Sequence, residues 1–185
     1  MIDSFVTLSP IPGFRKWLEA KNMQVDHENP FYDDTLLTEE DLTRLVDGGV
    51  IKILDPPISQ RHHQYAGFSQ MLSAIESLEG LQVHTPVVQP ILMKLATRYI
   101  VLEKHRGEPL DQVARFHIGN GAEVYRINYG ADLSRNGMQS SFGMMVNYRY
   151  QMDDIADNQR KYELDLRIPV DKQVTDWIPL HVENN

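Results

Sequence analysis

Apolar residues recur at helical spacing in four stretches of the chain, which predicts four amphipathic helices. Thr38 precedes the second of these stretches as a suitable N-cap, and the acidic residues that follow it suit the first turn of a helix. Gly48 and Gly80 are expected to end the second and third helices, and Pro90 stands where a helix start tolerates proline. The predicted helices span residues 14–21, 38–48, 68–79 and 91–104.

Short β-prone runs flank these helices and predict strands towards both ends of the chain. Asn120-Gly121, which lies between two such runs, favours a hairpin turn. The polar segments 22–35 and 153–165 are expected to be irregular, the second as a loop or a frayed helix. The fold class is therefore mixed α+β, with helices in the middle and predicted strands at residues 4–8, 115–118, 123–129 and 144–152.

Length and composition describe a globular chain of one domain. The 185 residues are 42% hydrophobic and 24% charged, which is the usual balance for a folded protein. No apolar run approaches the roughly 20 residues that span a bilayer, so no membrane segment is expected. The first four residues carry neither a basic region nor an apolar signal core, so the cytoplasm is the expected location.

The formal charge of −8 makes nucleic acid an unexpected partner, because such binding depends on neutralising phosphates. The local basic group Lys104-His105-Arg106 fits either a small phosphorylated ligand or a solvated helix C-terminus. The chain has no cysteine, which excludes disulfides, thiolate nucleophiles and cysteine-based zinc sites. The adjacent pair His62-His63 has the wrong spacing for two ligands on one helix face, so no metal site is predicted.

The common catalytic motifs are also absent: there is no Gly-x-Ser-x-Gly elbow, no phosphate loop and no His-Glu-x-x-His. Ser9 begins a rigid turn between the first predicted strand and the first predicted helix, the kind of junction at which α/β folds bind ligands. Taken alone, Ser9 before Pro10 is also typical of a turn serine that hydrogen-bonds the backbone. His117, between Phe116 and Ile118, is also typical of a hydrogen-bonded core histidine.

Three longer strings are more specific. Together, and in this order, they resemble the C-terminal part of malonyl-CoA decarboxylases. The resemblance covers residues 5–18 and 86–152 well, includes 22–85 only as a helical insertion, and is weak after 153. The strings are Phe5-Val6-Thr7-Leu8-Ser9-Pro10-Ile11-Pro12-Gly13-Phe14, Glu103-Lys104-His105-Arg106-Gly107 leading into Val113-Ala114-Arg115-Phe116-His117-Ile118-Gly119-Asn120-Gly121-Ala122, and Gly143-Met144-Met145-Val146-Asn147-Tyr148-Arg149-Tyr150.

The resemblance implies an acetyltransferase-like (GNAT) catalytic domain that converts malonyl-CoA to acetyl-CoA and carbon dioxide, with no cofactor beyond the CoA of the substrate. It implies catalytic roles for Ser9 and His117 and a substrate-binding role for Tyr150. The whole chain, 1–185, would then be a single partial catalytic domain with a helical insertion at about 22–105.

In the family, a segment that carries the CoA pyrophosphate loop precedes the Leu-Ser-Pro string. The chain begins a few residues before Ser9, so we expect a fragment or subunit that alone binds CoA weakly. An exposed sheet edge would then invite a homo-oligomer or a complementing chain. Two alternatives stay open: an inactive remnant or partner-binding subunit, and a different acyl-CoA enzyme such as an acetyltransferase.

The implied chemistry makes a geometric prediction. Loss of carbon dioxide leaves a thioester enolate, whose oxygen needs hydrogen-bond donors and whose carbon needs a proton from a positioned acid. A histidine carries such a proton near neutral pH, and a serine hydroxyl orients the carboxylate or relays the proton. We therefore expect the Ser9 and His117 side chains, on two different strands, to converge across a gap of roughly 4–8 Å, with Tyr150 lining the same cavity.

Overall fold

The computed structural model describes residues 3–23, 36–52 and 60–178, apart from the side chains of a few residues at the start of the helix at 60–74. The chain folds into two compact units, one formed by 1–14 with 93–185 and the other by 15–92. The predicted irregular segment 22–35 falls almost wholly outside the described residues, as do the last seven residues. The single-domain organisation with an insertion at about 22–105 stays a prediction.

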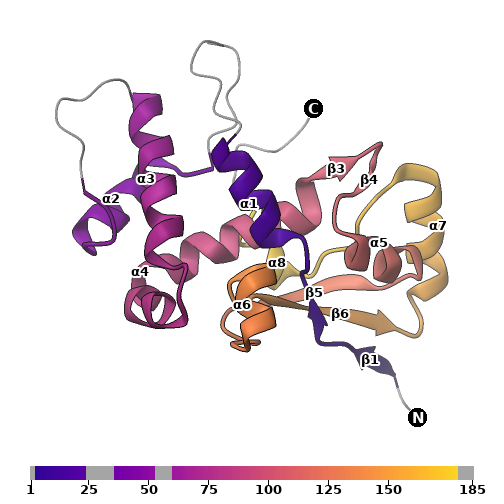
Figure 1. Ribbon diagram of the computed structural model, residues 1–185. Coiled ribbons are helices and arrows are strands. Elements are labelled where there is room, and N and C mark those ends of the chain that lie inside the picture. Colours follow the sequence, from indigo (N-terminus) through magenta and orange to yellow (C-terminus); the bar gives the residue numbers. More distant parts are fainter. Residues whose placement is uncertain (1–2, 24–35, 53–59, 179–185) are drawn as a thin grey trace. The chain divides into compact units, whose positions relative to one another are not determined.

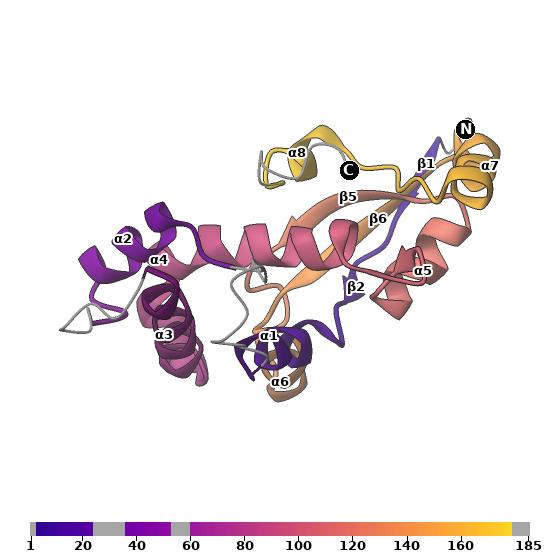
Figure 2. The same cartoon turned by 90° about the horizontal axis from the view of Figure 1, so that it is seen from above.

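The first unit contains an antiparallel sheet built around one central strand (Figure 1). Strand β6 (Met145–Gln151) pairs on one side with β5 (Glu123–Asn128) and on the other with β1 (Ser4–Val6) and β2 (Ser9–Pro10). Figure 2 shows the same order from above, with β6 between β5 and the N-terminal strands. The predicted strands at 123–129 and 144–152 are therefore confirmed, and the one predicted at 4–8 is confirmed for residues 4–6.

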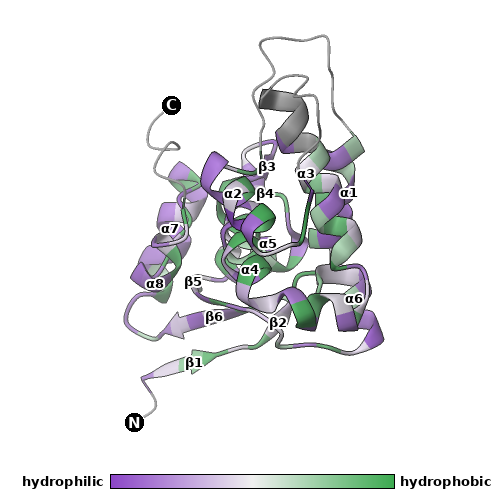
Figure 3. Ribbon diagram, turned by 90° about the vertical axis from the view of Figure 1, so that its left-hand side faces the viewer, coloured by the Kyte–Doolittle hydropathy of each residue, from purple (hydrophilic) through white to green (hydrophobic). Residues whose placement is uncertain are grey.

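Short helices and a small hairpin surround this sheet. Helix α7 (Ile155–Asp165) occupies most of the segment 153–165 that was predicted as a loop or frayed helix, and Tyr162 is its one buried residue. Its ribbon is accordingly mostly hydrophilic in Figure 3. These elements are η1, a π-helical turn (Arg98–Leu102), β3 (Lys104–His105), β4 (Glu108–Pro109), α5 (Gln112–Gly119), α6 (Arg135–Ser141), α7 (Ile155–Asp165) and α8 (Lys172–Thr175).

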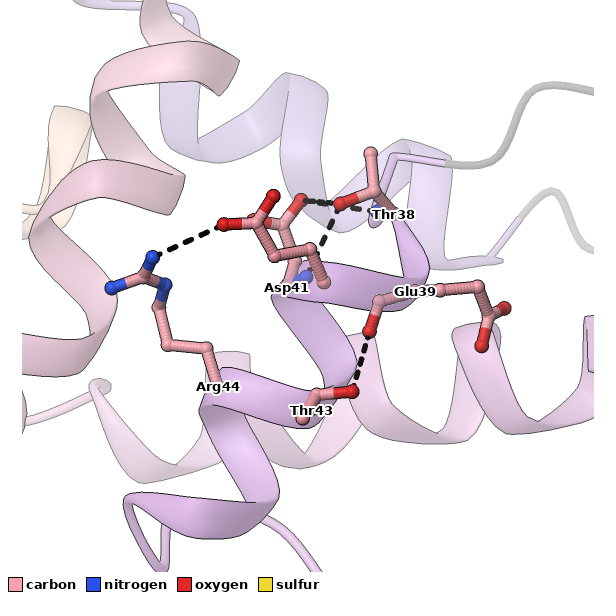
Figure 4. Close-up of polar contacts among 6 residues, drawn as sticks. Thr38, Glu39, Asp41, Thr43 and Arg44 are labelled. Atoms are coloured by element: carbon pink, nitrogen blue, oxygen red, sulfur yellow. Dashed lines mark hydrogen bonds and ion pairs between the residues drawn. The ribbon is translucent and has the colours of Figure 1, made fainter.

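The described part of the second unit is helical. Its helix α2 has the predicted N-cap: the Thr38 hydroxyl accepts from the backbone N–H of Asp41, and the Asp41 carboxylate accepts from the N–H of Thr38 (Figure 4). Gly48 ends this helix as expected. The helices are α1 (Phe14–Met23), which begins at the boundary between the units, α2 (Glu39–Asp47), α3 (Gln60–Ala74) and α4 (Leu78–Thr97), which continues into the first unit.

The predicted break at Gly80 is misplaced. Helix α3 ends at Ala74, and Gly80 lies inside the first turn of α4 rather than after a helix. A β-carbon at Gly80 would collide with the carbonyl oxygen of Ala74. The glycine therefore permits a close approach between the end of one helix and the start of the next.

The predicted start of a helix at Pro90 is also wrong. Helix α4 runs through both Pro86 and Pro90 from Leu78. Each proline removes one backbone hydrogen bond from a helix interior, which costs about 3 kcal/mol. Burial of apolar side chains along the helix offsets this cost, since each buried leucine or isoleucine contributes roughly 1.5–3 kcal/mol. The buried side chains are Leu81, Val88, Ile91, Leu92, Met93, Leu95 and Ala96.

Within the described residues, no helix is both long and apolar enough to cross a membrane.

Candidate functional site

Helix α5 carries His117, in place of the strand predicted at 115–118. Asp111 starts the helix: its carboxylate accepts from the backbone N–H groups of Val113 at 3.0 Å and Ala114 at 2.9 Å. Ala114 and Ile118, one helical turn apart, are both buried, whereas Phe116 is 64% exposed. This helical period overrides the β propensity of the segment, and the predicted hairpin at Asn120-Gly121 is instead a turn from α5 into β5.

The sheet presents a row of polar side chains on the face that His117 meets. Ser9 pairs with Val146 and, without any shift of register, Thr7 donates its backbone N–H to the carbonyl of Tyr148. Directly opposed residues of antiparallel strands, and alternate residues along a strand, project to one face. Thr7, Ser9, Tyr148 and Tyr150 therefore share a face.

The two residues that the family resemblance singled out are in direct contact. Ser9 Oγ lies 3.2 Å from His117 Nε2, and Ser9 is only 6% exposed. The predicted convergence is confirmed, but the predicted gap of roughly 4–8 Å is wrong because the two groups hydrogen-bond to each other. The hydrogen-bonded pair therefore leaves no room for another group between its two atoms.

Tyr150 belongs to the same cluster. Its hydroxyl lies 2.8 Å from Nδ1, the other ring nitrogen of His117. The imidazole is thus hydrogen-bonded at both nitrogens, to a serine hydroxyl and to a phenol. Direct contact between Tyr150 and substrate stays a prediction.

Tyr148 is a site residue that the sequence analysis did not single out. Its ring stacks on the His117 ring, with centroids 4.4 Å apart and planes 21° apart, and it is fully buried. Its hydroxyl has no hydrogen-bond partner among the described residues. The alternation along the predicted strand 144–152 places it on the same face as Tyr150, which was the available signal.

Burial determines the charge state of this cluster. It lowers the pKa of His117 below its ordinary value, because desolvation disfavours the imidazolium. Burial also raises the pKa of Tyr150 and, more strongly, that of Tyr148. At neutral pH the imidazole of His117 is therefore neutral, and the phenols of Tyr148 and Tyr150 are protonated.

A second polar group lies beneath the start of α5. Asp111 is 2% exposed and, besides capping the helix, accepts a hydrogen bond from the Tyr99 hydroxyl of η1. Burial raises the pKa of Asp111 even though its three hydrogen bonds favour the carboxylate. Burial and the nearby carboxyl group also raise the pKa of Tyr99. Asp111 thereby fixes the helix that presents His117, and an aspartate followed by a Gln-Val-Ala run was the sequence signal for that helix start.

The basic group at 104–106 lies elsewhere. Lys104 and His105 form β3, and Arg106 occupies the turn of the β3–β4 hairpin with φ of 55°, so the predicted helix C-terminus is wrong. All three side chains are exposed. Among the described residues, no cluster of three or more histidine and acidic side chains is arranged to hold a metal ion.

Comparisons with known proteins agree on one family. A family model described as the malonyl-CoA decarboxylase C-terminal domain matches residues 1–184. The mitochondrial malonyl-CoA decarboxylases of the goose Anser anser anser and of Mus musculus are 33% and 34% identical to the chain over its whole length. The chain spans only about a third of these relatives, 34% and 35% of their lengths.

Solved structures give the same result. The malonyl-CoA decarboxylase of Cupriavidus metallidurans is similar to 96% of this chain with a TM-score of 0.67 and 33% identity, and 39% of that chain is covered. The malonyl-CoA decarboxylase of Rhodopseudomonas palustris is also similar over 96% of this chain, with a TM-score of 0.66 and 34% identity, and 33% of its chain is covered.

Proposed function

Because the chain belongs to the malonyl-CoA decarboxylase C-terminal domain family, we propose that it supplies the catalytic pair of a malonyl-CoA decarboxylase. Ser9 and His117 are that pair. The supporting observation is the 3.2 Å contact between Ser9 Oγ and His117 Nε2, made by residues 108 positions apart in the chain. Tyr150 supports the pair from the other ring nitrogen.

The reaction breaks the bond between C2 of the malonyl group and its carboxylate. The electron pair of that bond moves into the thioester as an enolate, and carbon dioxide leaves. C2 then takes one proton, which gives acetyl-CoA, and the protein recovers that proton from solvent. The protein must therefore hold the carboxylate, stabilise the enolate oxygen and deliver one proton to carbon.

The site chemistry suits delivery of that proton. Ser9 Oγ and His117 Nε2 are the two exchangeable positions of the pair: Nε2 takes up a proton from solvent, and that proton reaches C2 either directly from Nε2 or through Ser9 Oγ. A histidine with a lowered pKa is neutral near pH 7, so it accepts and returns a proton without a large energetic cost. The half-buried phenol of Tyr150, whose pKa is raised, stays protonated and hydrogen-bonds the ring throughout.

Under the same proposal, the antiparallel sheet and its helices form the C-terminal part of an acetyltransferase-like (GNAT) domain, whose full sheet is expected to be mixed, with malonyl-CoA as substrate and no cofactor beyond its CoA. A cytoplasmic location also stays a prediction, and the goose and mouse relatives are described as mitochondrial. A homo-oligomer or a complementing chain stays the predicted form of assembly.

The test is release of carbon dioxide from malonyl-CoA by the full natural protein that carries this chain. We expect acetyl-CoA and carbon dioxide in equal amounts. His117→Asn should lower kcat by on the order of 10²–10⁴-fold with little change in KM, because a proton donor acts in the transition state. His84→Asn, at a histidine of α4 that belongs to neither the cluster nor the basic group at 104–106, is the matched control and should leave kcat unchanged.

Two outcomes would contradict the proposal. Retained kcat with a raised KM in His117→Asn would make His117 a binding residue. Acetyl transfer from acetyl-CoA to an amine, without carbon dioxide release from malonyl-CoA, would favour the acetyltransferase alternative. The partner-binding alternative requires neither reaction, and the comparisons do not favour it.

A further inference from the structure

Thr7 interrupts the backbone ladder at the site. Strand β1 ends at Val6 and β2 begins at Ser9, yet their pairing with β6 continues in one register. Thr7 donates its N–H to the carbonyl of Tyr148 at 2.9 Å, as regular antiparallel pairing requires. The return bond is different: the Tyr148 N–H donates to Thr7 Oγ1 at 3.2 Å and not to the Thr7 carbonyl.

The side chain of Asn147 accounts for this exchange. Asn147 Nδ2 donates to the Thr7 carbonyl at 2.5 Å, and Asn147 Oδ1 accepts from Asn128 Nδ2 at 2.8 Å. This bridge runs from Asn128 of β5 through Asn147 of β6 to Thr7, and it occupies the Thr7 carbonyl that would otherwise accept from the Tyr148 N–H. The Thr7 hydroxyl takes its place, so each of the three polar groups of Thr7 is held by β6.

This arrangement gives the Thr7 hydroxyl a fixed direction. A backbone N–H only donates, so Thr7 Oγ1 must accept from Tyr148. The hydroxyl hydrogen of Thr7 is left to donate elsewhere, and Thr7 Oγ1 lies 3.0 Å from Ser9 Oγ. Alternate residues of an extended chain share a face, which is why the two hydroxyls are neighbours.

We propose that Thr7 is a positioning residue, which donates to Ser9 Oγ and so turns the Ser9 hydrogen towards His117 Nε2. Neutral His117 then carries its hydrogen on Nδ1 and donates it to the Tyr150 hydroxyl. If Ser9 donated to Thr7 Oγ1 instead, the hydroxyl hydrogen of Thr7 would have no acceptor among the residues that the structure describes. The backbone N–H of Tyr148 thus selects the tautomer of His117 through two hydroxyl groups.

The test is the tautomer itself, read from ¹⁵N NMR of the histidine rings in the ligand-free protein above the titration range of His117. His117→Asn assigns the signals, because it removes only the ring in question. We expect a bare, accepting Nε2 and a protonated Nδ1 in the parent protein and in Thr7→Ser. Thr7→Val, which is nearly isosteric but has no hydroxyl, should shift the Nε2 signal towards its protonated position.

A protonated Nε2 in the parent protein would overturn the proposal, and this result does not depend on whether Thr7→Val folds. An unchanged Nε2 signal in a folded Thr7→Val protein would also overturn it. Only the kinetic consequence rests on the proposed function. Because His117 Nε2 has to be free to take up the proton that reaches C2, kcat should fall about tenfold in Thr7→Val and recover in Thr7→Ser. Tautomer and turnover are measured separately, so a failure of the decarboxylase assignment leaves the positioning role testable.

Discussion

The imidazole of His117 is enclosed by three side chains from two strands. Ser9 and Tyr150 hydrogen-bond its two nitrogens, and the Tyr148 ring covers one face. The hydroxyl groups of Ser9 and Tyr150 are hydrogen-bond partners for both nitrogens of the neutral ring. None of the three side chains carries a negative charge that would stabilise an imidazolium. This explains why burial lowers the pKa of His117 instead of being offset by a carboxylate.

This environment predicts a pH dependence of stability. The pKa of His117 lies below its ordinary value of 6.5 in the folded protein, so at mildly acidic pH the unfolded chain binds a proton that the folded chain does not. The stability contributed by neutral His117 is present above about pH 6.5 and is lost as the pH falls through the lowered pKa. The stability advantage of the parent over His117→Gln should therefore shrink between pH 7.5 and pH 5.

Urea unfolding at several pH values measures this difference. Carboxylates titrate in both proteins, so subtraction of the two unfolding free energies isolates the contribution of His117. A difference that stays constant or grows as the pH falls would show that folding does not disfavour protonation of His117.

At the scale of elements, the sequence predicted what depends on local periodicity and capping. The strands around Tyr148 and Val124 follow from alternation, and helix α2 follows from the capping pattern at Thr38. Helix α5 was missed because Arg115 to Ile118 has β propensity, and only packing decides in favour of the helical period. No local pattern could give the Ser9–His117 contact, because it depends on how α5 packs on a sheet formed by distant segments. The family resemblance identified the pair, and the tertiary structure supplied its geometry.

Helix α5 should depend on its buried cap. Asp111→Ala removes the acceptor of two backbone N–H groups and of the Tyr99 hydroxyl. Loss of the cap costs about 0.5–2 kcal/mol. Loss of Asp111 as an acceptor for the Tyr99 hydroxyl adds about 1–3 kcal/mol. We expect the free energy of unfolding to fall by about 2–4 kcal/mol, together with kcat, since α5 holds His117.

Asp111→Asn is the matched control for this prediction. Its amide oxygen still accepts at the helix N-terminus, so stability should stay within about 1 kcal/mol of the parent protein. Equal losses in both variants, measured by urea unfolding, would mean that the charge of Asp111 matters and its cap does not.

Helix α2 offers a smaller test at an exposed end. Thr38→Ala removes the hydroxyl that accepts from the Asp41 N–H and donates to the Asp41 carboxylate at 2.8 Å (Figure 4). The free energy of unfolding should fall by about 1 kcal/mol, and Thr38→Ser should restore it. A loss that serine does not restore would assign the effect to the threonine methyl group and not to the cap.

At the scale of the whole molecule, helix α4 contributes long segments to both compact units. It runs without interruption from Leu78 to Thr97, across the boundary between residues 92 and 93. Leu92 and Leu95, on either side of that boundary, are both buried. Unfolding one unit therefore removes the packing of part of this helix, and helix formation is cooperative along its length.

We therefore predict that the two units unfold in a single transition. The chain has two tryptophans, Trp17 in one unit and Trp177 in the other, so each unit has its own fluorescent reporter. Trp177→Phe leaves Trp17 as the only reporter, and Trp17→Phe leaves Trp177. Adding Thr38→Ala, in the unit of Trp17, should lower the urea midpoint by the same amount in both single-tryptophan proteins, because a single transition transmits any destabilisation to the whole chain. A midpoint that shifts for Trp17 but not for Trp177 would show instead that the helical unit unfolds separately from the unit that carries Ser9 and His117.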